Sequence, residues 1–96
     1  MDDAGQQKPP LASGLLAYFP KALREVAKVS LAGERQHHGK QAHLHWDRTK
    51  SPNDLDSLTR HLLHHVEGEM RDDDGQLHLA KAAWRSLAAL ERLLDA

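Results

Sequence analysis

Two leucine-rich stretches of the chain repeat their apolar residues at helical spacing. At about 100° per residue, five apolar residues of the first stretch share one face: Leu55, Leu58, Leu62, Val66 and Met70. One face of the second stretch carries Leu79, Ala83, Leu87, Leu90 and Leu94. An apolar face of this width is typical of a helix that packs on a core. We therefore predict two helices whose leucine faces are buried.

Capping residues mark the ends of these two helices. Asn53 or Asp54 can cap the first helix, and Gly68 is expected to weaken or end it. Asp74 follows an acidic run and is a suitable N-cap for the second helix.

The first half of the chain is expected to hold one more main helix. Pro20 suits the first turn of a helix, and Gly33 suits its C-cap. The apolar piece at 11–19 predicts a short N-terminal helix, and residues 1–10 predict a flexible arm. Residues 33–53 lack periodicity, so we expect a long loop that is either functional or disordered.

These elements predict an all-α domain over residues 11–96, a small bundle of three main helices and a short N-terminal helix. The composition agrees, because aromatic residues make up only 4% of the chain and the core must be mostly Leu, Ala and Val. A domain of 96 residues with so thin a core is marginally stable alone. We therefore expect a homo-oligomer.

Charge and cysteine content exclude several classes of protein. The formal net charge of −1 gives no global basic field, so no nucleic-acid partner is expected. The absence of cysteine excludes disulfides and thiolate metal sites. No apolar run approaches the roughly 20 residues of a membrane span. The sequence therefore predicts a cytoplasmic protein.

Carboxylates and histidines gather around the turn between the two leucine-rich helices. Glu69 and Asp72 are three residues apart, a spacing that on a helix places both carboxylates on one face, where they can hold Mg²⁺. His61 lies on the same edge, and His78 can ligate a softer metal or contact a phosphate. Acidic residues before a helix also favour the helix dipole without any function, and His64 is expected to face solvent.

Basic and aromatic residues supply candidate nucleotide contacts. Trp46 can stack on a base, with Arg48 and Lys50 near its phosphates, although an isolated tryptophan is commonly a packing anchor. Lys81 and Arg85 form either a solvated face or, if they point at the acidic turn, contacts to the oxygens of a triphosphate.

Four segments of the chain resemble the phage-associated dATP/dGTP diphosphohydrolase domain, which is grouped with the all-α MazG-like nucleotide pyrophosphohydrolases. The segments are FPKALREVAKVSLAGERQHHG, HWDRTKS, DSLTRHL and DDDGQLHLAKAAWRSLAALE. The resemblance implies Mg²⁺- or Mn²⁺-dependent cleavage of a purine deoxynucleoside triphosphate to its monophosphate and pyrophosphate. It also implies an oligomeric, phage-encoded protein in a bacterial host cell.

The resemblance also assigns individual residues. Glu69 and Asp72 resemble the E-x-x-D metal pair of the MazG-like group, and Glu25 resembles the opposing carboxylate. Three further residues fall on motif positions of the family: Arg60, His61 and His78.

One departure concerns the opposing carboxylates. MazG-like enzymes pair E-x-x-D with an E-x-x-E, but here the step is Glu25-x-x-Lys28, and a protonated lysine cannot ligate a metal. The site is then either incomplete or completed by Asp56 or by another subunit.

Three functions are compatible with these patterns. The first is a metal-dependent hydrolase of purine nucleoside triphosphates. Its candidate catalytic residues are Glu69, Asp72 and His61, and its metal ligands are Glu25, Glu69 and Asp72. Its nucleotide contacts are Trp46, Arg48, Lys50, Arg60, His78, Lys81 and Arg85. The second is a non-catalytic phage protein that sequesters a nucleotide used as a defence signal, and the third is a helical interaction module. No His-Asp dipeptide supports an HD-type phosphohydrolase.

Overall fold

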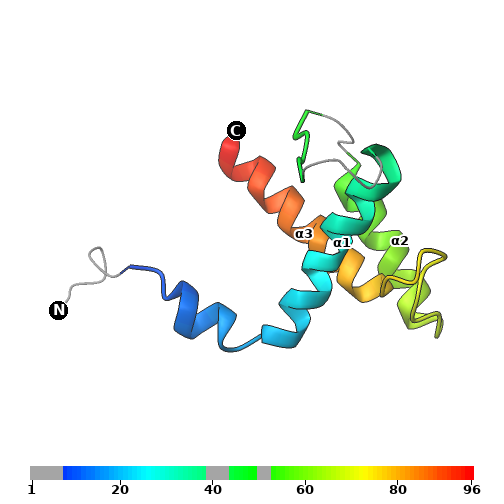
Figure 1. Cartoon of the computed structure of the whole chain (residues 1–96), viewed down its shortest axis with the longest axis horizontal. Coiled ribbons are helices and arrows are strands. Elements are labelled where there is room, and N and C mark those ends of the chain that lie inside the picture. The colour runs from blue at the N-terminus through cyan, green and yellow to red at the C-terminus, as the bar shows by residue number, and fades with distance from the viewer. Residues whose placement is uncertain (1–7, 39–43, 50–52) are drawn as a thin grey trace.

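The computed structural model describes residues 8–38, 44–49 and 53–96, with the backbone alone for residues 34–38. It confirms the all-α class. A short π-helix, η2 (Ala12–Leu16), precedes three main helices, α1 (Pro20–His38), α2 (Asp54–Val66) and α3 (His78–Asp95). Within the described ranges no strand forms, and the β-pairing consists of a single bridge between Arg71 and Leu77. The helix α3 packs along α2 and also contacts α1 (Figure 1).

The first main helix begins where the sequence predicts but ends later. Pro20 is its first residue, whereas Gly33, the expected C-cap, lies inside it, and the helix continues to His38. Gly33 does not have the positive φ of a helix-ending glycine. A glycine inside a helix costs about 1 kcal/mol relative to alanine, which is too little by itself to end a helix of this length. The predicted loop at 33–53 is therefore shorter than expected.

The second main helix has the expected start. Asn53 occupies the N-cap position, although its side chain makes no capping hydrogen bond. The helix ends at Val66, and Gly68 follows with a φ of 95°, a conformation that glycine adopts without steric penalty. Because the helix stops there, Glu69 lies outside it.

The third main helix starts four residues after Asp74, the expected N-cap. Leu77 occupies the N-cap position instead. The Asp74 carboxylate accepts a hydrogen bond from the backbone N–H of Gln76, 3.0 Å away, and so closes a tight turn in which Gly75 has a φ of 83°. The carboxylate is therefore used within the turn and not on the helix terminus.

The predicted burial of the leucine faces is wrong. On α3 the exposed large apolar residues include Leu79, Leu87, Leu90 and Leu94, and on α2 they include Leu55, Leu62 and Val66. Leu87 and Leu90 are 52% and 51% exposed. Met70, at the end of the α2 stripe, is also exposed, whereas Leu58 is half-buried. We call the seven residues Leu55, Leu62, Val66, Leu79, Leu87, Leu90 and Leu94 the outer leucine faces.

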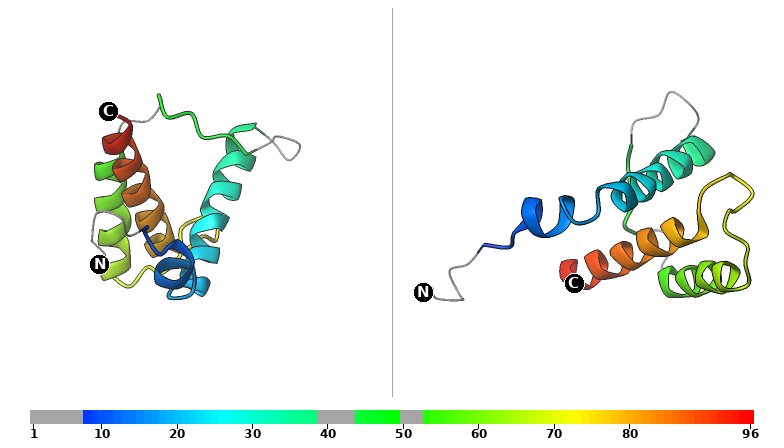
Figure 2. Two further views of the ribbon diagram at one scale, coloured as in Figure 1. Left: turned by 90° about the vertical axis from the view of Figure 1, so that its left-hand side faces the viewer. Right: turned by 90° about the horizontal axis from the view of Figure 1, so that it is seen from below.

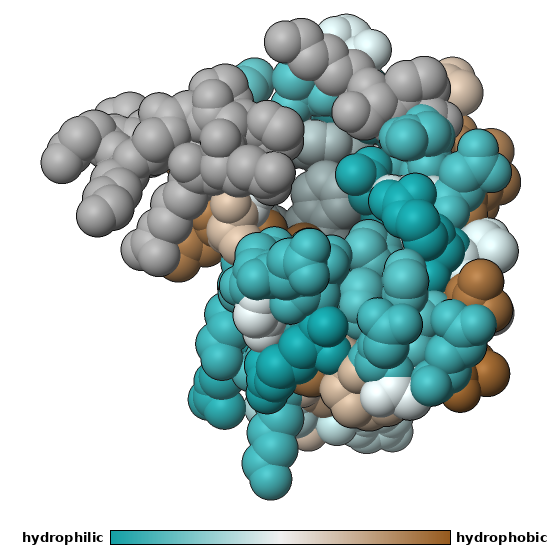
Figure 3. Space-filling view, turned by 90° about the vertical axis from the view of Figure 1, so that its right-hand side faces the viewer, coloured by the Kyte–Doolittle hydropathy of each residue, from teal (hydrophilic) through white to brown (hydrophobic). Residues whose placement is uncertain are grey.

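Polar and small residues fill the interior instead. Among the described residues, the buried apolar side chains are those of Ala80, Ala82 and Ala88. Four buried polar residues of α2 and α3, here called the polar seam, are Asp54, Ser57, His61 and His78. Ion pairs and a histidine contact join the two helices, so the polar sides face one another and the leucines point outward. Figure 3 shows a mostly hydrophilic face with hydrophobic residues exposed along its margin.

The N-terminal segment projects away from the three main helices (Figures 1 and 2). The helix η2 confirms the expected short helix, while most of the predicted arm lies outside the described residues. The large side chains of the segment around η2 are exposed, including Leu11, Leu16 and Tyr18. None of the described helices is long and apolar enough to cross a membrane.

Candidate functional site

Two buried histidines join α2 to α3. His61 lies on α2 and is 8% exposed, and His78 is the first residue of α3 and is 3% exposed. Their Nδ1 atoms are 2.9 Å apart, so one ring donates a hydrogen bond and the other accepts it. The His78 backbone N–H donates to the carbonyl of Met70, which fixes the start of α3 against the preceding segment. The two imidazoles are thus held in contact by both helices.

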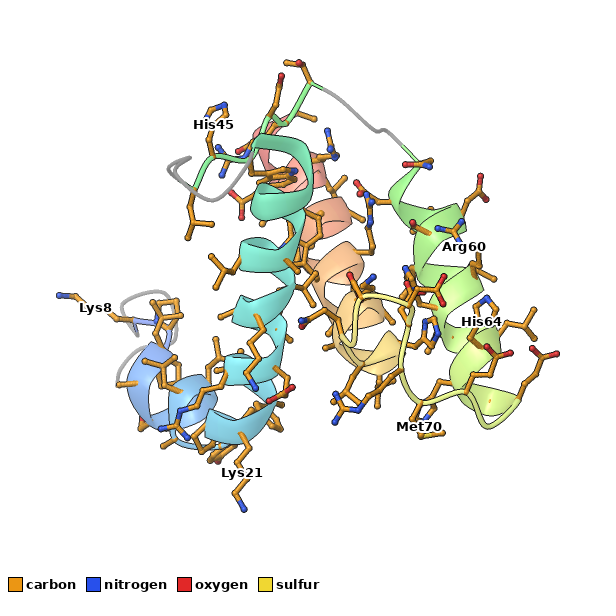
Figure 4. All side chains as sticks on the ribbon, turned by 45° about the vertical axis from the view of Figure 1, so that its right-hand side comes forward. Lys8, Lys21, His45, Arg60, His64 and Met70 are labelled. Atoms are coloured by element: carbon orange, nitrogen blue, oxygen red, sulfur yellow. The ribbon has the colours of Figure 1, made fainter. Side chains whose placement is uncertain are left out.

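A third histidine adds to this cluster. His64, expected to face solvent, is half-buried on α2, and its ring stacks on that of His78 with centroids 4.7 Å apart. Its Nδ1 lies 3.4 Å from an Oε1 of Glu69, close enough for an ion pair if the ring is protonated. That geometry does not make a hydrogen bond, and the buried Nδ1 has no hydrogen-bond partner. Figure 4 shows His64 on α2, with Met70 where the chain has left this helix.

The acidic turn before α3 holds a lysine. The Lys81 Nζ lies 2.8 Å from an oxygen of Asp72 and 2.8 Å from an oxygen of Asp74. The hydrogen bond from Lys81 is the main reason that the pKa of Asp72 falls to about 2. Burial alone would lower the pKa of Lys81, but the two carboxylates outweigh it and raise that pKa. Lys81 therefore points at the acidic turn. The sequence made this orientation the condition for Lys81 to contact a phosphate.

Burial also changes the chemistry of His61. Desolvation, followed by the positive charge of Lys81, lowers the pKa of His61 to about 4, while the Asp72 carboxylate partly opposes this shift. The ring is therefore neutral at neutral pH, the form in which a ring nitrogen can bind a metal. A group with this pKa is poorly matched to proton abstraction near pH 7. The shift thus favours a ligand role for His61 over a role as general base.

The described residues form two sets of side chains that could hold a metal ion. One set is His61, Asp72 and His78, and the other is His64, Glu69 and His78. In each set the candidate ligand atoms lie within 4.8 Å of one another. The two sets share His78, so all five residues meet at one corner of the molecule, and four of them were predicted from the sequence as site residues. We call the five residues the histidine–carboxylate corner: His61, His64, Glu69, Asp72 and His78.

The structure does not bring Glu25 into either set. Its carboxylate accepts a hydrogen bond from the Lys28 Nζ, 2.7 Å away and one turn along α1. Glu69 and Asp72 also differ from expectation, because both lie in the segment after Val66, where α2 has ended. Their spacing therefore does not place them on one helical face, and each belongs to a different set.

The predicted base contact, Trp46, packs against α3. Its ring meets that of Trp84 edge-to-face, with centroids 5.5 Å apart. The guanidinium groups of Arg48 and Arg92 lie over the Trp46 ring, 4.8 Å and 5.3 Å from its centroid. These contacts agree with the alternative role of Trp46 as a packing anchor. Lys50, the neighbouring candidate, lies outside the described residues.

The remaining basic candidates have partners within the protomer. Arg85 and Arg92 both bind the buried carboxylate of Asp54, at 2.9 Å and 2.7 Å. Arg85 therefore does not point at the acidic turn. Lys81 and Arg85 do not form the solvated face that was the alternative, because both side chains are in ion pairs. Arg60 is exposed and donates a hydrogen bond to the Ser57 hydroxyl at 3.1 Å. The ion-pairing role of Asp54 was not predicted from the sequence, because a helix cap already explained its position.

Arg48 also approaches two carboxylates near the end of α3. Its guanidinium lies 3.9 Å from Glu91 and 3.5 Å from Asp95. All three side chains are about half exposed, so these ion pairs contribute little to stability. The contacts hold the segment around Trp46 against α3, at the opposite end of that helix from His78.

Comparison with protein-family models gives a match over nearly the whole chain. The family model for the N-terminal domain of dATP/dGTP diphosphohydrolase matches residues 2–95. No curated protein and no solved structure matches the chain. The phage origin and the MazG-like grouping remain predictions. Because the family model covers nearly the whole chain, the protein belongs to the dATP/dGTP diphosphohydrolase N-terminal domain family.

Proposed function

We propose that this protein hydrolyses a purine deoxynucleoside triphosphate, such as dATP or dGTP, to the monophosphate and pyrophosphate. In this reaction a water oxygen bonds to the α-phosphorus, and the bond from that phosphorus to the bridging oxygen breaks. Pyrophosphate leaves with the bridging oxygen, and the proton of the water passes to solvent. A bound Mg²⁺ or Mn²⁺ would polarise the phosphate oxygens and lower the pKa of the attacking water. Membership of the family supports the substrate class.

The convergence of His61, His64, Glu69, Asp72 and His78 is the observation that carries the proposal. These side chains are the oxygen and nitrogen ligands that divalent ions use in proteins. Asp72 has the lowered pKa of a carboxylate that stays ionised at any physiological pH, as a ligand must. The donor set therefore fits a divalent ion.

Two basic side chains are the candidates for binding the phosphates. Arg60 is exposed one residue before His61, and its remaining N–H groups can bind phosphate oxygens in pairs. Lys81 lies at the acidic turn and becomes available to a phosphate when Asp72 and Asp74 release it. Arg60 and Lys81 are therefore better placed for this role than Trp46, which contacts other side chains.

Release of pyrophosphate tests this function. The full chain is incubated with each deoxynucleoside triphosphate and Mg²⁺ or Mn²⁺, and the products are separated by chromatography. Asp72→Asn and Glu69→Gln should each slow pyrophosphate release at least about 100-fold, since each removes a charged ligand needed in the transition state. Glu67→Gln is the matched control, because Glu67 is exposed near Glu69 and belongs to neither set. Unchanged rates in both ligand variants would exclude this site as the catalytic one.

The alternative function is nucleotide binding without hydrolysis, and one contact favours it. Lys28 neutralises Glu25 through a 2.7 Å ion pair, so the carboxylate that resembles the opposing metal ligand is bound to an ammonium group. A binding protein would show a higher melting temperature with the nucleotide and return the nucleotide unchanged. The same chromatography therefore separates the two functions.

We also propose that the chain self-associates through the outer leucine faces. Three alanines are the buried apolar residues of the described part of the protomer, while leucines such as Leu87 and Leu90 are half exposed. Fully burying a leucine contributes about 1.5–3 kcal/mol, so a second copy of the same helices that covers the exposed half of several leucines would supply stability that the protomer lacks.

A further inference from the structure

The donor atoms at the histidine–carboxylate corner are chiefly imidazole nitrogens. His61 and His78 present their Nδ1 atoms to one another at 2.9 Å, and Asp72 supplies an oxygen to the same set. Two nitrogens bound to one Zn²⁺ at about 2.0–2.1 Å in a tetrahedral array are about 3.3 Å apart. We propose that His61, His78 and Asp72 bind a first-row transition ion, typified by Zn²⁺ or Mn²⁺, in preference to Mg²⁺. The ion takes the place of the hydrogen bond between the two rings.

The proposed ion would be the metal of the proposed hydrolysis, so the inference rests on that function. Its test measures metal binding and not turnover of the nucleotide. To accept an ion, the two nitrogens must separate by a few tenths of an ångström and both rings must turn their Nδ1 lone pairs towards it. The ring that donates the hydrogen bond must also move its proton from Nδ1 to Nε2. Both rings are held by packing between α2 and α3, so little side-chain entropy remains to be lost when a metal binds. The structure therefore presents two preorganised ligands.

A second, independent feature is the Nδ1 of His64. This atom is buried and has no hydrogen-bond partner, although buried polar atoms in proteins nearly always have one. Its ring stacks on His78, and its Nδ1 lies near Glu69 in the second set. An ion beside His78 would give this nitrogen, directly or through a water, the partner that it lacks.

The ligand types determine which ion is preferred. Imidazole suits Zn²⁺, Ni²⁺ and similar ions, whereas Mg²⁺ prefers carboxylates, waters and phosphate oxygens in octahedral geometry. A site with two ring nitrogens and one carboxylate should therefore bind Zn²⁺ more tightly than Mn²⁺, and both more tightly than Mg²⁺. A site built by Glu69 and Asp72 without the histidines would not discriminate against Mg²⁺ in this way.

Lys81 provides a second test, because its ammonium group now occupies the cation position beside Asp72. One Asp72 oxygen accepts a hydrogen bond from Lys81 at 2.8 Å, and the other accepts from the Asp73 N–H at 2.8 Å. A metal that binds Asp72 must therefore displace or approach this ammonium group. Lys81→Met removes the competing charge and keeps the length of the side chain, so it should tighten metal binding by at least about fivefold.

Isothermal titration calorimetry of the full chain with Zn²⁺, Mn²⁺ and Mg²⁺ tests the proposal. We expect Zn²⁺ to bind more tightly than Mg²⁺ by at least about tenfold, and His61→Ala or His78→Ala to weaken Zn²⁺ binding by at least about tenfold. His65→Ala is the matched control, because His65 is half-buried on the same helix and belongs to neither set. Equal affinity for Mg²⁺ and Zn²⁺, or unchanged Zn²⁺ binding in both alanine variants, would overturn the proposal.

Two further measurements cover the case in which the alanine variants fail to fold. Lys81→Met should bind Zn²⁺ more tightly than the wild-type chain, and weaker binding would contradict the proposal. In the wild-type chain, ¹⁵N NMR of the imidazoles should show Zn²⁺-dependent shifts at His61 and His78. Shifts confined to other histidines would assign the ion to the surface and remove the site.

The outcomes also separate this site from the proposed hydrolysis. Tight Zn²⁺ binding through His61 and His78 without release of pyrophosphate would retain the metal site and reject the hydrolysis. Hydrolysis with Mg²⁺ that needs Glu69 and Asp72, in a chain whose histidine variants bind Zn²⁺ normally, would reject the metal site and retain the hydrolysis.

Discussion

Along α2 and α3, the polar seam is buried between the helices, whereas the outer leucine faces are exposed on the same helices. Asp54 is 3% exposed, while Val66 on the same helix is 79% exposed. This is the reverse of an ordinary surface helix, in which the apolar face is buried and the charged face meets water. The two regions therefore contribute to stability through different interactions.

The polar seam holds α2 against α3 through paired charges and hydrogen bonds. A buried ion pair contributes little net stability relative to an apolar pair, but the loss of one partner is costly. The exposed part of the outer leucine faces contributes to stability only when another surface covers it. The seam therefore fixes the arrangement of the helices, and the leucine faces are available for assembly.

Removal of the Asp54 carboxylate should have the largest effect. Asp54→Ala leaves Arg85 and Arg92 without the acceptor that they share, and breaking a buried ion pair costs about 3–5 kcal/mol. Urea unfolding of purified protein measures this change. Asp56→Ala is the matched control, because Asp56 is exposed in the same first turn of α2 and should change the free energy of unfolding by less than about 0.5 kcal/mol. Equal effects of the two variants would mean that the seam does not hold the helices together.

The pH dependence of stability tests the seam at His61. Because burial lowers the pKa of His61 from 6.5 to about 4, the unfolded chain binds a proton in this interval and the native protein does not. The stability that neutral His61 contributes to the folded protein is fully present above about pH 6.5. It is lost as the pH falls towards 4, and the free energy of unfolding decreases by at most about 3 kcal/mol. Urea unfolding in EDTA from pH 7 to pH 4 measures it. The His61→Gln variant should lack this slope, and a His61 ring that titrates near its ordinary pKa would contradict the prediction.

The sequence could predict the helices better than their packing. Pro20, Asn53 and Gly68 mark helix ends through local steric and hydrogen-bonding effects, and the structure agrees with each. Gly33 and Asp74 were misleading, because a glycine can remain helical and a carboxylate can bind a nearer N–H group or a lysine. Periodicity shows which residues share a face, but the surface that covers this face depends on contacts distant in the sequence or on another chain.

The candidate site was predictable only in part for the same reason. Spacing and the acidic turn placed His61, Asp72 and His78 near one another, and the structure brings them together. His64 was not predicted as a site residue, because it was expected to face solvent. Asp54 was not predicted as a seam residue, because a helix cap already explained its position. The assignment of Glu25 depended on family resemblance alone, and no set in the described residues includes it.

A charge on an outer leucine face should weaken self-association without unfolding the protomer. Leu90 is 51% exposed, so Leu90→Glu removes little packing within the chain. If a second copy covers the exposed half of this residue, the substitution should weaken association by at least about 0.8–1.5 kcal/mol, or about 4- to 13-fold. Sedimentation velocity over a range of concentrations measures the change. Leu44→Glu is the control at an exposed leucine outside the main helices, and a monomeric wild-type chain would reject self-association through these faces.

The smallest effect is expected where α1 meets α3, a contact that belongs to neither region. The Trp84 Nε1–H donates to the Ser30 hydroxyl at 2.7 Å and so joins α3 to α1, and Ser30→Ala should cost about 1 kcal/mol. Ser86→Ala is the control, because Ser86 is exposed on α3 and the substitution gains the same helix propensity. The difference in the free energy of unfolding between the two variants therefore measures the Ser30–Trp84 hydrogen bond. Urea unfolding measures both. One neutral hydrogen bond is weaker than the two ion pairs at Asp54, so Ser30→Ala should lower the free energy of unfolding by less than Asp54→Ala does. Equal losses in the two variants would mean that the contact with α1 is as necessary as the polar seam for holding α3.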